Sequence, residues 1–166
     1  MRPAFSAIIR SWIRTARINR HTERQGRVSQ GETLVKIEGR CHCAKITYEA
    51  DIDPDTVGIC HCADCQMLTG TAFRTTVRAS AESFVLHGQP RIYIKTADSG
   101  TKRAHAFCPD CGTPIYAAAP QDPPTYSLRL GTIAQRTQLR PKRQNWCRSA
   151  LPWAMDLQDV AQFDRQ

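Results

Sequence analysis

Eight cysteines are the residues of this sequence best suited to chemistry, and seven of them lie in three tight groups. The groups are Cys41-His42-Cys43, Cys60-His61-Cys62-Ala63-Asp64-Cys65 and Cys108-Pro109-Asp110-Cys111-Gly112. Cysteines this close in the chain bridge to one another only with strain, whereas they converge readily on a metal ion. The spacing therefore favours metal binding over two alternatives, a disulfide framework and reduced structural thiols.

Ligand counting predicts two unequal zinc sites. Thiolate-only sites select zinc or iron–sulfur clusters, and this grouping does not match the ferredoxin spacings. A closed structural zinc takes four ligands, which leaves three thiolates for a second ion. The middle group can form a local tripod from Cys60, Cys62 and Cys65, because an x-x turn returns the third cysteine to the first two. The remaining pairs would then make a four-thiolate site from Cys41, Cys43, Cys108 and Cys111, although other partitions of the seven stay open.

A three-thiolate zinc has a definite chemistry. Three thiolates on a dication leave a net charge of −1, so the ion is a weaker Lewis acid than one held by three imidazoles. It still accepts a further soft ligand, and it deprotonates a bound thiol. The predicted open position therefore indicates a thiol substrate. The alternative is that a side chain closes the site, and the candidates are His61, Asp64 and His105.

The cysteine groups, in this order, resemble the glutathione-dependent formaldehyde-activating enzyme (GFA) family, also called the centromere protein V domain family. The matching segments are Glu38–Cys43, Cys60–Gln66 with Thr69-Gly70, Phe107–Pro114, and Trp146 with Ser149–Trp153. The resemblance covers about residues 33–155, and Gly112 suits the last motif because a positive φ is often needed after its second cysteine.

The resemblance implies a mainly β fold of the β-tent type, with small sheets packed around two zinc ions per chain. It implies a structural zinc at Cys41, Cys43, Cys108 and Cys111 and a catalytic zinc at Cys60, Cys62 and Cys65. It also implies a carbon–sulfur lyase that acts on a glutathione-like thiol and a small aldehyde such as formaldehyde, forming or cleaving an S-hydroxyalkyl adduct. The alternative is a non-catalytic zinc scaffold or protein-interaction module.

Charge and length set the domain organisation. The chain has 166 residues and a formal net charge of +8, but residues 1–30 hold seven arginines and one acid, so the rest of the chain carries only +2. A nearly neutral body argues against nucleic acid as a partner. No stretch is long and apolar enough for a transmembrane helix. We expect a basic extension and linker over 1–32, the zinc domain over 33–158 and a tail over 159–166, in a cytoplasmic protein.

Apolar residues of the first segment recur at the spacing of one helical face, from Phe5 to Ala16. The segment predicts a short basic amphipathic helix. Three interpretations apply to it: a mitochondrial transit peptide, which would place the protein in the matrix; a membrane-surface or partner helix; and an extension without function. We favour the last, because the family resemblance begins only after it.

The body predicts short strands joined by turns, with one helical turn over 63–69. The predicted strands are 33–38, 45–49, 57–61, 71–78, 84–86, 91–96, 102–107, 115–118 and 126–130. Arg40, Lys45 and Arg74 lie near the cysteine groups in sequence, and each could bind a carboxylate, although a solvated charge is the commoner role. Cys147 is predicted to be a buried thiol, and the basic run 140–143 a solvated face.

Overall fold

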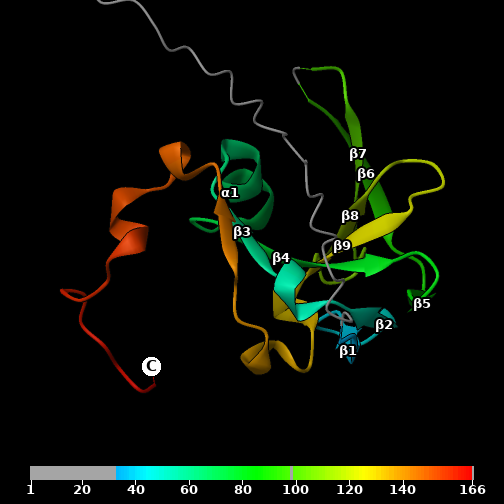
Figure 1. Cartoon of the computed structure of the whole chain (residues 1–166), viewed down its shortest axis with the longest axis horizontal. Helices are drawn as coiled ribbons and strands as arrows, with labels where there is room; N and C mark the ends of the chain where they lie inside the picture. Colours follow the sequence, from blue (N-terminus) through cyan, green and yellow to red (C-terminus); the bar gives the residue numbers. More distant parts are fainter. Residues whose placement is uncertain (1–32, 98, 166) are drawn as a thin grey trace, which may run out of the picture. The chain divides into compact units, whose positions relative to one another are not determined.

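The computed structural model describes residues 33–97 and 99–165, which form antiparallel β-structure with one short helix (Figure 1). The strands are β1 (Val35–Arg40), β2 (Thr47–Ile52), β3 (Gly58–Cys60), β4 (Arg74–Ser80), β5 (Val85–His87), β6 (Arg91–Thr96), β7 (Lys102–Phe107), β8 (Pro114–Ala118), β9 (Thr125–Arg129) and β10 (Arg143–Asn145). The helix α1 is Ala63–Thr69, and short 3-10 turns lie at Pro54–Thr56, Leu130–Thr132, Arg136–Gln138, Cys147–Ser149 and Pro152–Met155.

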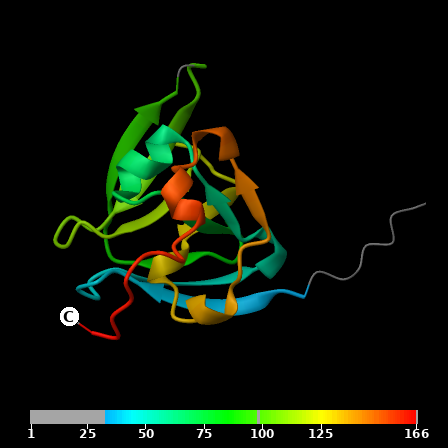
Figure 2. The same ribbon diagram turned by 90° about the vertical axis from the view of Figure 1, so that its left-hand side faces the viewer.

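The strands follow one path, β1-β2-β4-β9-β8-β7-β6, in which every neighbouring pair is antiparallel. Three short strands attach to this path. β5 pairs with β2, β3 pairs with β4, and β10 lies parallel to β3 (Figure 2). The last strand in the sequence, β10, therefore pairs with the strand that ends at Cys60.

The predicted mainly β fold is confirmed, and the helical turn predicted over 63–69 matches α1. β10 was not predicted, because its three residues are polar and exposed. The predicted N-terminal helix lies outside the described residues, and the domain limits 33–158 and 159–166 stay predictions. No helix in 33–97 or 99–165 is long and apolar enough to cross a membrane.

The two faces of the central strands differ in chemistry. Because side chains alternate along a strand, Val77 of β4 and Leu128 of β9 face each other in the apolar core. Their sequence neighbours Thr76 and Arg129 pair on the opposite face. This second face extends across the sheet through the pairs Ser127 with Ala117, Ala117 with His105 and Arg103 with Lys95. One side of the sheet is thus apolar, and the other carries cations.

The apolar core uses few aromatic rings and concentrates them. The ring of Phe84 lies 4.5–5.7 Å, between centroids, from the rings of Tyr48, Tyr116 and Tyr126. Aliphatic side chains such as Ile37 and Ile133 fill the remainder, and Cys41 and Cys108 are fully buried within the same cluster. Two of the predicted zinc ligands are therefore part of the core itself.

Gly39 shows how closely the first hairpin packs. It lies opposite Tyr48 in the β1–β2 register. A Cβ at this position would come within 2.0 Å of the Tyr48 ring. The ring lies over the glycine backbone, and the Tyr48 hydroxyl forms a 2.6 Å hydrogen bond with the hydroxyl of Thr132. Only glycine allows this approach, two residues before Cys41.

Candidate functional site

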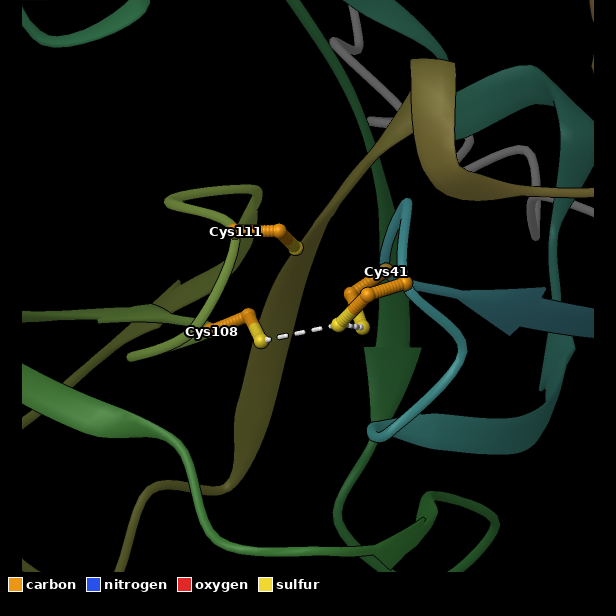
Figure 3. A group of neighbouring side chains, drawn as sticks. Cys41, Cys108 and Cys111 are labelled. Carbon is orange, nitrogen blue, oxygen red and sulfur yellow. Dashed lines mark hydrogen bonds between the residues drawn. The ribbon is translucent and has the colours of Figure 1, made fainter.

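Four cysteines from two distant turns converge on one point. Cys41 and Cys43 lie in the turn between β1 and β2, and Cys108 and Cys111 lie in the turn between β7 and β8 (Figure 3). All four Sγ atoms lie within 4.8 Å of one another, with 3.5 Å between Cys41 and Cys43 and 3.7 Å between Cys43 and Cys108. With Zn–S bonds of about 2.3 Å, a tetrahedron has edges of about 3.8 Å. The donor set and its spacing therefore fit a tetrahedral four-thiolate zinc.

Both turns adopt the backbone shape that directs two thiols to one side. The Gly112 N–H donates to the Cys108 carbonyl at 2.9 Å, and Gly112 has a φ of +71°, which confirms its predicted conformation. In the first turn Ala44 takes the equivalent place, with a φ of +61° and a 3.1 Å hydrogen bond to the Cys41 carbonyl. The Ile46 N–H donates to the Cys41 sulfur at 3.3 Å. This backbone donor stabilises a thiolate in a buried position.

Thr113 connects the two turns. Its hydroxyl accepts a hydrogen bond from the His42 N–H at 3.1 Å and lies 3.1 Å from the sulfur of Cys111. The hydroxyl proton therefore points to the sulfur. This contact is the largest cause that lowers the pKa of Cys111 to about 5, so the thiolate needed by a metal is favoured at neutral pH. Thr113 follows the Cys108–Gly112 motif directly, but the sequence gives no signal of this role because the contact with His42 depends on how the two turns pack.

The second cluster is local, as the tripod prediction required. Cys60 ends β3, Cys62 immediately precedes α1, and Cys65 lies in the first turn of α1, where it is buried. Their Sγ atoms lie within 4.8 Å of one another, and the sulfurs of Cys60 and Cys62 are 3.6 Å apart. This spacing again matches a zinc–thiolate tetrahedron, with three of its four corners supplied.

No His, Asp or Glu side chain joins the three sulfurs as a fourth ligand in the ranges 33–97 and 99–165. His61 turns away, with its Nε2 atom 2.8 Å from Oε1 of Gln144 and its ring against Phe73. Asp64 forms an ion pair with Lys95. His105 is bound instead by Arg129. The three candidates for closing the site therefore have other partners, and the cluster is a trio.

A cavity of about 180 Å³ opens beside the trio. It lies on the cationic face of the sheet, roofed by residues of α1. Its lining residues are Cys60, Cys62, Asp64, Leu68, Arg74, Thr76, Lys95, Arg103, His105, Ala117, Ser127 and Arg129. Arg74 was singled out from the sequence. The other cations were missed, because only strand pairing brings β6, β7 and β9 to the trio, and a single basic residue in a strand gives no sequence signal.

His105 has a defined protonation state in this cavity. Nη2 of Arg129 lies 3.1 Å from Nδ1 of His105, and an arginine can only donate. Nδ1 is therefore the acceptor, and the proton of the neutral ring sits on Nε2. Burial, followed by the charge of Arg129, lowers the pKa of His105 to about 4. The ring is neutral at physiological pH and offers one N–H donor.

A larger cavity lies elsewhere, next to the four-cysteine cluster. It has a volume of about 760 Å³, and Arg40, Tyr48 and Arg136 are among its lining residues. The nearby cluster already has four thiolates, so it offers no position to a ligand. We therefore place the candidate site at the smaller cavity. Lys45, the third cation named from the sequence, pairs with Asp110 on the surface.

One local prediction about the C-terminal part was wrong, because Cys147 is exposed rather than buried. The basic run Arg140, Lys142 and Arg143 is exposed, as predicted. Arg143 also stands in β10, and its Nη2 donates to the Thr56 carbonyl at 3.1 Å. This segment also supports the trio. Gln66 of α1 donates to the carbonyls of His61 and Ser149 at 2.7 and 2.9 Å, which ties the helix to the residues after β10.

The fold and the two clusters define a small β-domain built to bind metal through cysteines. Residues 36–149 match the family described as glutathione-dependent formaldehyde-activating enzyme, and the chain belongs to this GFA family. A crystal structure of a Rhodobacter sphaeroides protein is similar in fold, with a TM-score of 0.50 and 17% sequence identity over 65% of this chain and 99% of that one. No curated protein matches the chain significantly.

Proposed function

We propose that the chain is a zinc-dependent carbon–sulfur lyase-type enzyme that joins a glutathione-like thiol to a small aldehyde, or cleaves the resulting S-hydroxyalkyl adduct. The four-cysteine cluster holds a structural zinc, and the trio holds the catalytic one. One observation carries the proposal. The trio supplies three ligands, its neighbouring acid and histidines have other partners, and two of its cysteines, Cys60 and Cys62, line a cavity.

The chemistry of the reaction assigns tasks to the residues of the cavity. Cys60, Cys62 and Cys65 would hold the zinc ion, which would supply the Lewis-acid chemistry that favours the thiolate form of a thiol substrate. Addition of the sulfur to the aldehyde carbon moves the C=O electron pair to oxygen, which then takes up a proton. Neutral His105 presents its Nε2 proton to that oxygen, so it stabilises the developing negative charge by a hydrogen bond.

Arg129 positions His105 for this task. It holds Nδ1 as an acceptor and so keeps the single ring proton on Nε2. Leu68 and Ala117 contribute apolar side chains to the wall of the same cavity. The protonation of the adduct oxygen balances the proton that the thiol releases, so the overall reaction needs no external acid.

Metal analysis and titration test the proposal together. The native protein should contain two zinc ions per chain, and Cys62→Ala should contain one. Glutathione should bind the two-zinc protein in isothermal titration calorimetry and should fail to bind Cys62→Ala. Cys147→Ala is the matched control, because Cys147 is exposed and belongs to neither cluster. Two zinc ions without glutathione binding at millimolar concentration would contradict the enzyme and favour a zinc scaffold.

A further inference from the structure

The arginine at the end of β9 is buried and has unused hydrogen-bond donors. Arg129 is 5% exposed. Its Nη2 contacts His105, whereas Nε and Nη1 have no hydrogen-bond partner among the described residues. Nη1 of Arg74 is also buried and has no hydrogen-bond partner among the described residues. Buried donors without acceptors are costly, and native structures supply an acceptor to almost all of them. Both arginines line the cavity beside the trio, which therefore suits a ligand with several acceptor atoms.

The charges in the cavity do not balance. Arg74, Lys95, Arg103 and Arg129 line it, and the one carboxylate, Asp64, pairs with Lys95. None of the ion pairs within 33–97 and 99–165 involves the three arginines. Three thiolates with a divalent ion contribute a further −1, so two positive charges remain. Burial, then the charge of Arg74, lowers the pKa of Arg129 to about 9, which leaves it charged at neutral pH.

The size of the cavity limits what can balance this charge. Its volume is about 180 Å³, the space of about six water molecules at about 30 Å³ each. Pockets for drug-sized ligands occupy about 300–1,000 Å³. The tripeptide glutathione carries its carboxylates at the ends of the molecule, far along the chain from the sulfur. When its thiol is inside, the acid groups of glutathione would therefore lie outside this cavity, and its arginines are left to a more compact acid.

We propose that the cavity binds a compact carboxylate, which Arg129 and Arg74 hold within a few bonds of the reacting sulfur. The carboxylate belongs to a small mercapto acid or to a small aldehyde acid. Binding of the anion is independent of the proposed function, but its assignment as a substrate rests on that function. The covalent step is unchanged: the sulfur forms a bond to the aldehyde carbon, and the carbonyl oxygen takes up the proton that the thiol gives off.

Paired probes test this inference on the two-zinc protein by isothermal titration calorimetry. The first pair is 3-mercaptopropionate and 2-mercaptoethanol, and the second is glyoxylate and formaldehyde with a fixed thiol. In at least one pair, the acidic member should bind about ten- to a hundredfold more tightly than the neutral member. This ratio corresponds to the free energy of one or two charge-assisted hydrogen bonds. The pair that shows the difference identifies whether the thiol or the aldehyde carries the acid.

Variants assign the difference to the arginines. Arg129→Gln should abolish the preference for the acidic probe, and Arg129→Lys should restore part of it. If Arg129→Gln does not fold, Arg74→Gln gives the same test at a less buried position. Arg40→Gln is the control, because Arg40 is exposed and lines the other cavity. Zinc content measured on every variant separates loss of the anion site from loss of the metal.

The outcomes separate this inference from the proposed function. Equal binding of acidic and neutral probes, with 2-mercaptoethanol still bound, would overturn the anion site and leave the thiol chemistry intact. In that case the arginines serve to balance the thiolates. Binding of glyoxylate that depends on Arg129, without binding of any thiol, would support the anion site and contradict the enzyme.

Discussion

The two cysteine clusters are made of the same donor atoms but are built in opposite ways. The four-cysteine cluster joins turns that lie far apart in the sequence, and two of its members are in the apolar core. The trio comes from residues 60–65 and faces a cavity lined by cations. A metal that closes a long loop restricts the unfolded chain most. The first cluster is therefore suited to hold the fold, and the second to hold a ligand.

Removing one ligand from the four-cysteine cluster should have the largest effect. Structural zinc contributes about 10–16 kcal/mol of apparent folding free energy in small peptides, against a total stability of about 5–15 kcal/mol for a domain. Cys108→Ala should therefore leave the domain largely unfolded at 25 °C, as measured by near-UV circular dichroism. A cooperatively folded Cys108→Ala protein without zinc at this cluster would show that the two clusters do not differ in this way.

The equivalent change in the trio should separate chemistry from folding. Cys62→Ala should lose one zinc ion and all thiol binding. Its effect on folding should be small, because a metal that closes a short local loop restricts the unfolded chain little. We expect the free energy of unfolding to fall by about 1–3 kcal/mol, the range of an ordinary destabilising substitution. Urea unfolding followed by tryptophan fluorescence measures this value. If Cys62→Ala is as unstable as Cys108→Ala, the trio is structural too.

Protonation of His105, on the cationic face of the sheet, should lower the free energy of unfolding in acid. Burial lowers the pKa of His105 to about 4 from an ordinary value of 6.5, so the unfolded chain binds this proton more readily. The contribution is complete above about pH 6.5 and declines as the pH falls toward 4. His105→Gln should show a smaller fall in the free energy of unfolding between pH 7 and 5. The variant and the original protein protonate their cysteine thiolates alike. If the free energy of unfolding falls equally with pH in the two proteins, the acid sensitivity belongs to the metal clusters.

The smallest effect is expected on the surface of the four-cysteine cluster. Lys45 and Asp110 form a 2.9 Å ion pair between its two turns, with side chains 65% and 47% exposed. Exposed pairs contribute about 0–1 kcal/mol and are screened by salt. Lys45→Ala should therefore retain two zinc ions and nearly full stability in thermal unfolding. A large loss would mean that contacts outside the thiolates hold the turns together.

Sequence reasoning reached the two clusters but not the cavity between sheet and helix. The grouping of seven cysteines, the helical turn at 63–69 and most strands follow from local spacing and alternation. Arg129 could not be found in this way, because its burial depends on β9 pairing with β4. β10 was not predicted for the same reason: polar residues such as Gln144 form a strand there only because they pair with β3. Cys147 was expected in the core, but it precedes an exposed C-terminal segment that lacks strands.

The parallel pairing of β10 with β3 has a consequence for biosynthesis. The four-cysteine cluster is complete once residue 111 has been made. The trio's neighbours Gln144 and Ser149, which bind His61 and Gln66, come much later. The three cysteines of the trio are themselves made by residue 65, before the four-cysteine cluster is complete. On the ribosome we therefore expect a shortened chain to bind metal while the segment that carries the trio still lacks its late partners.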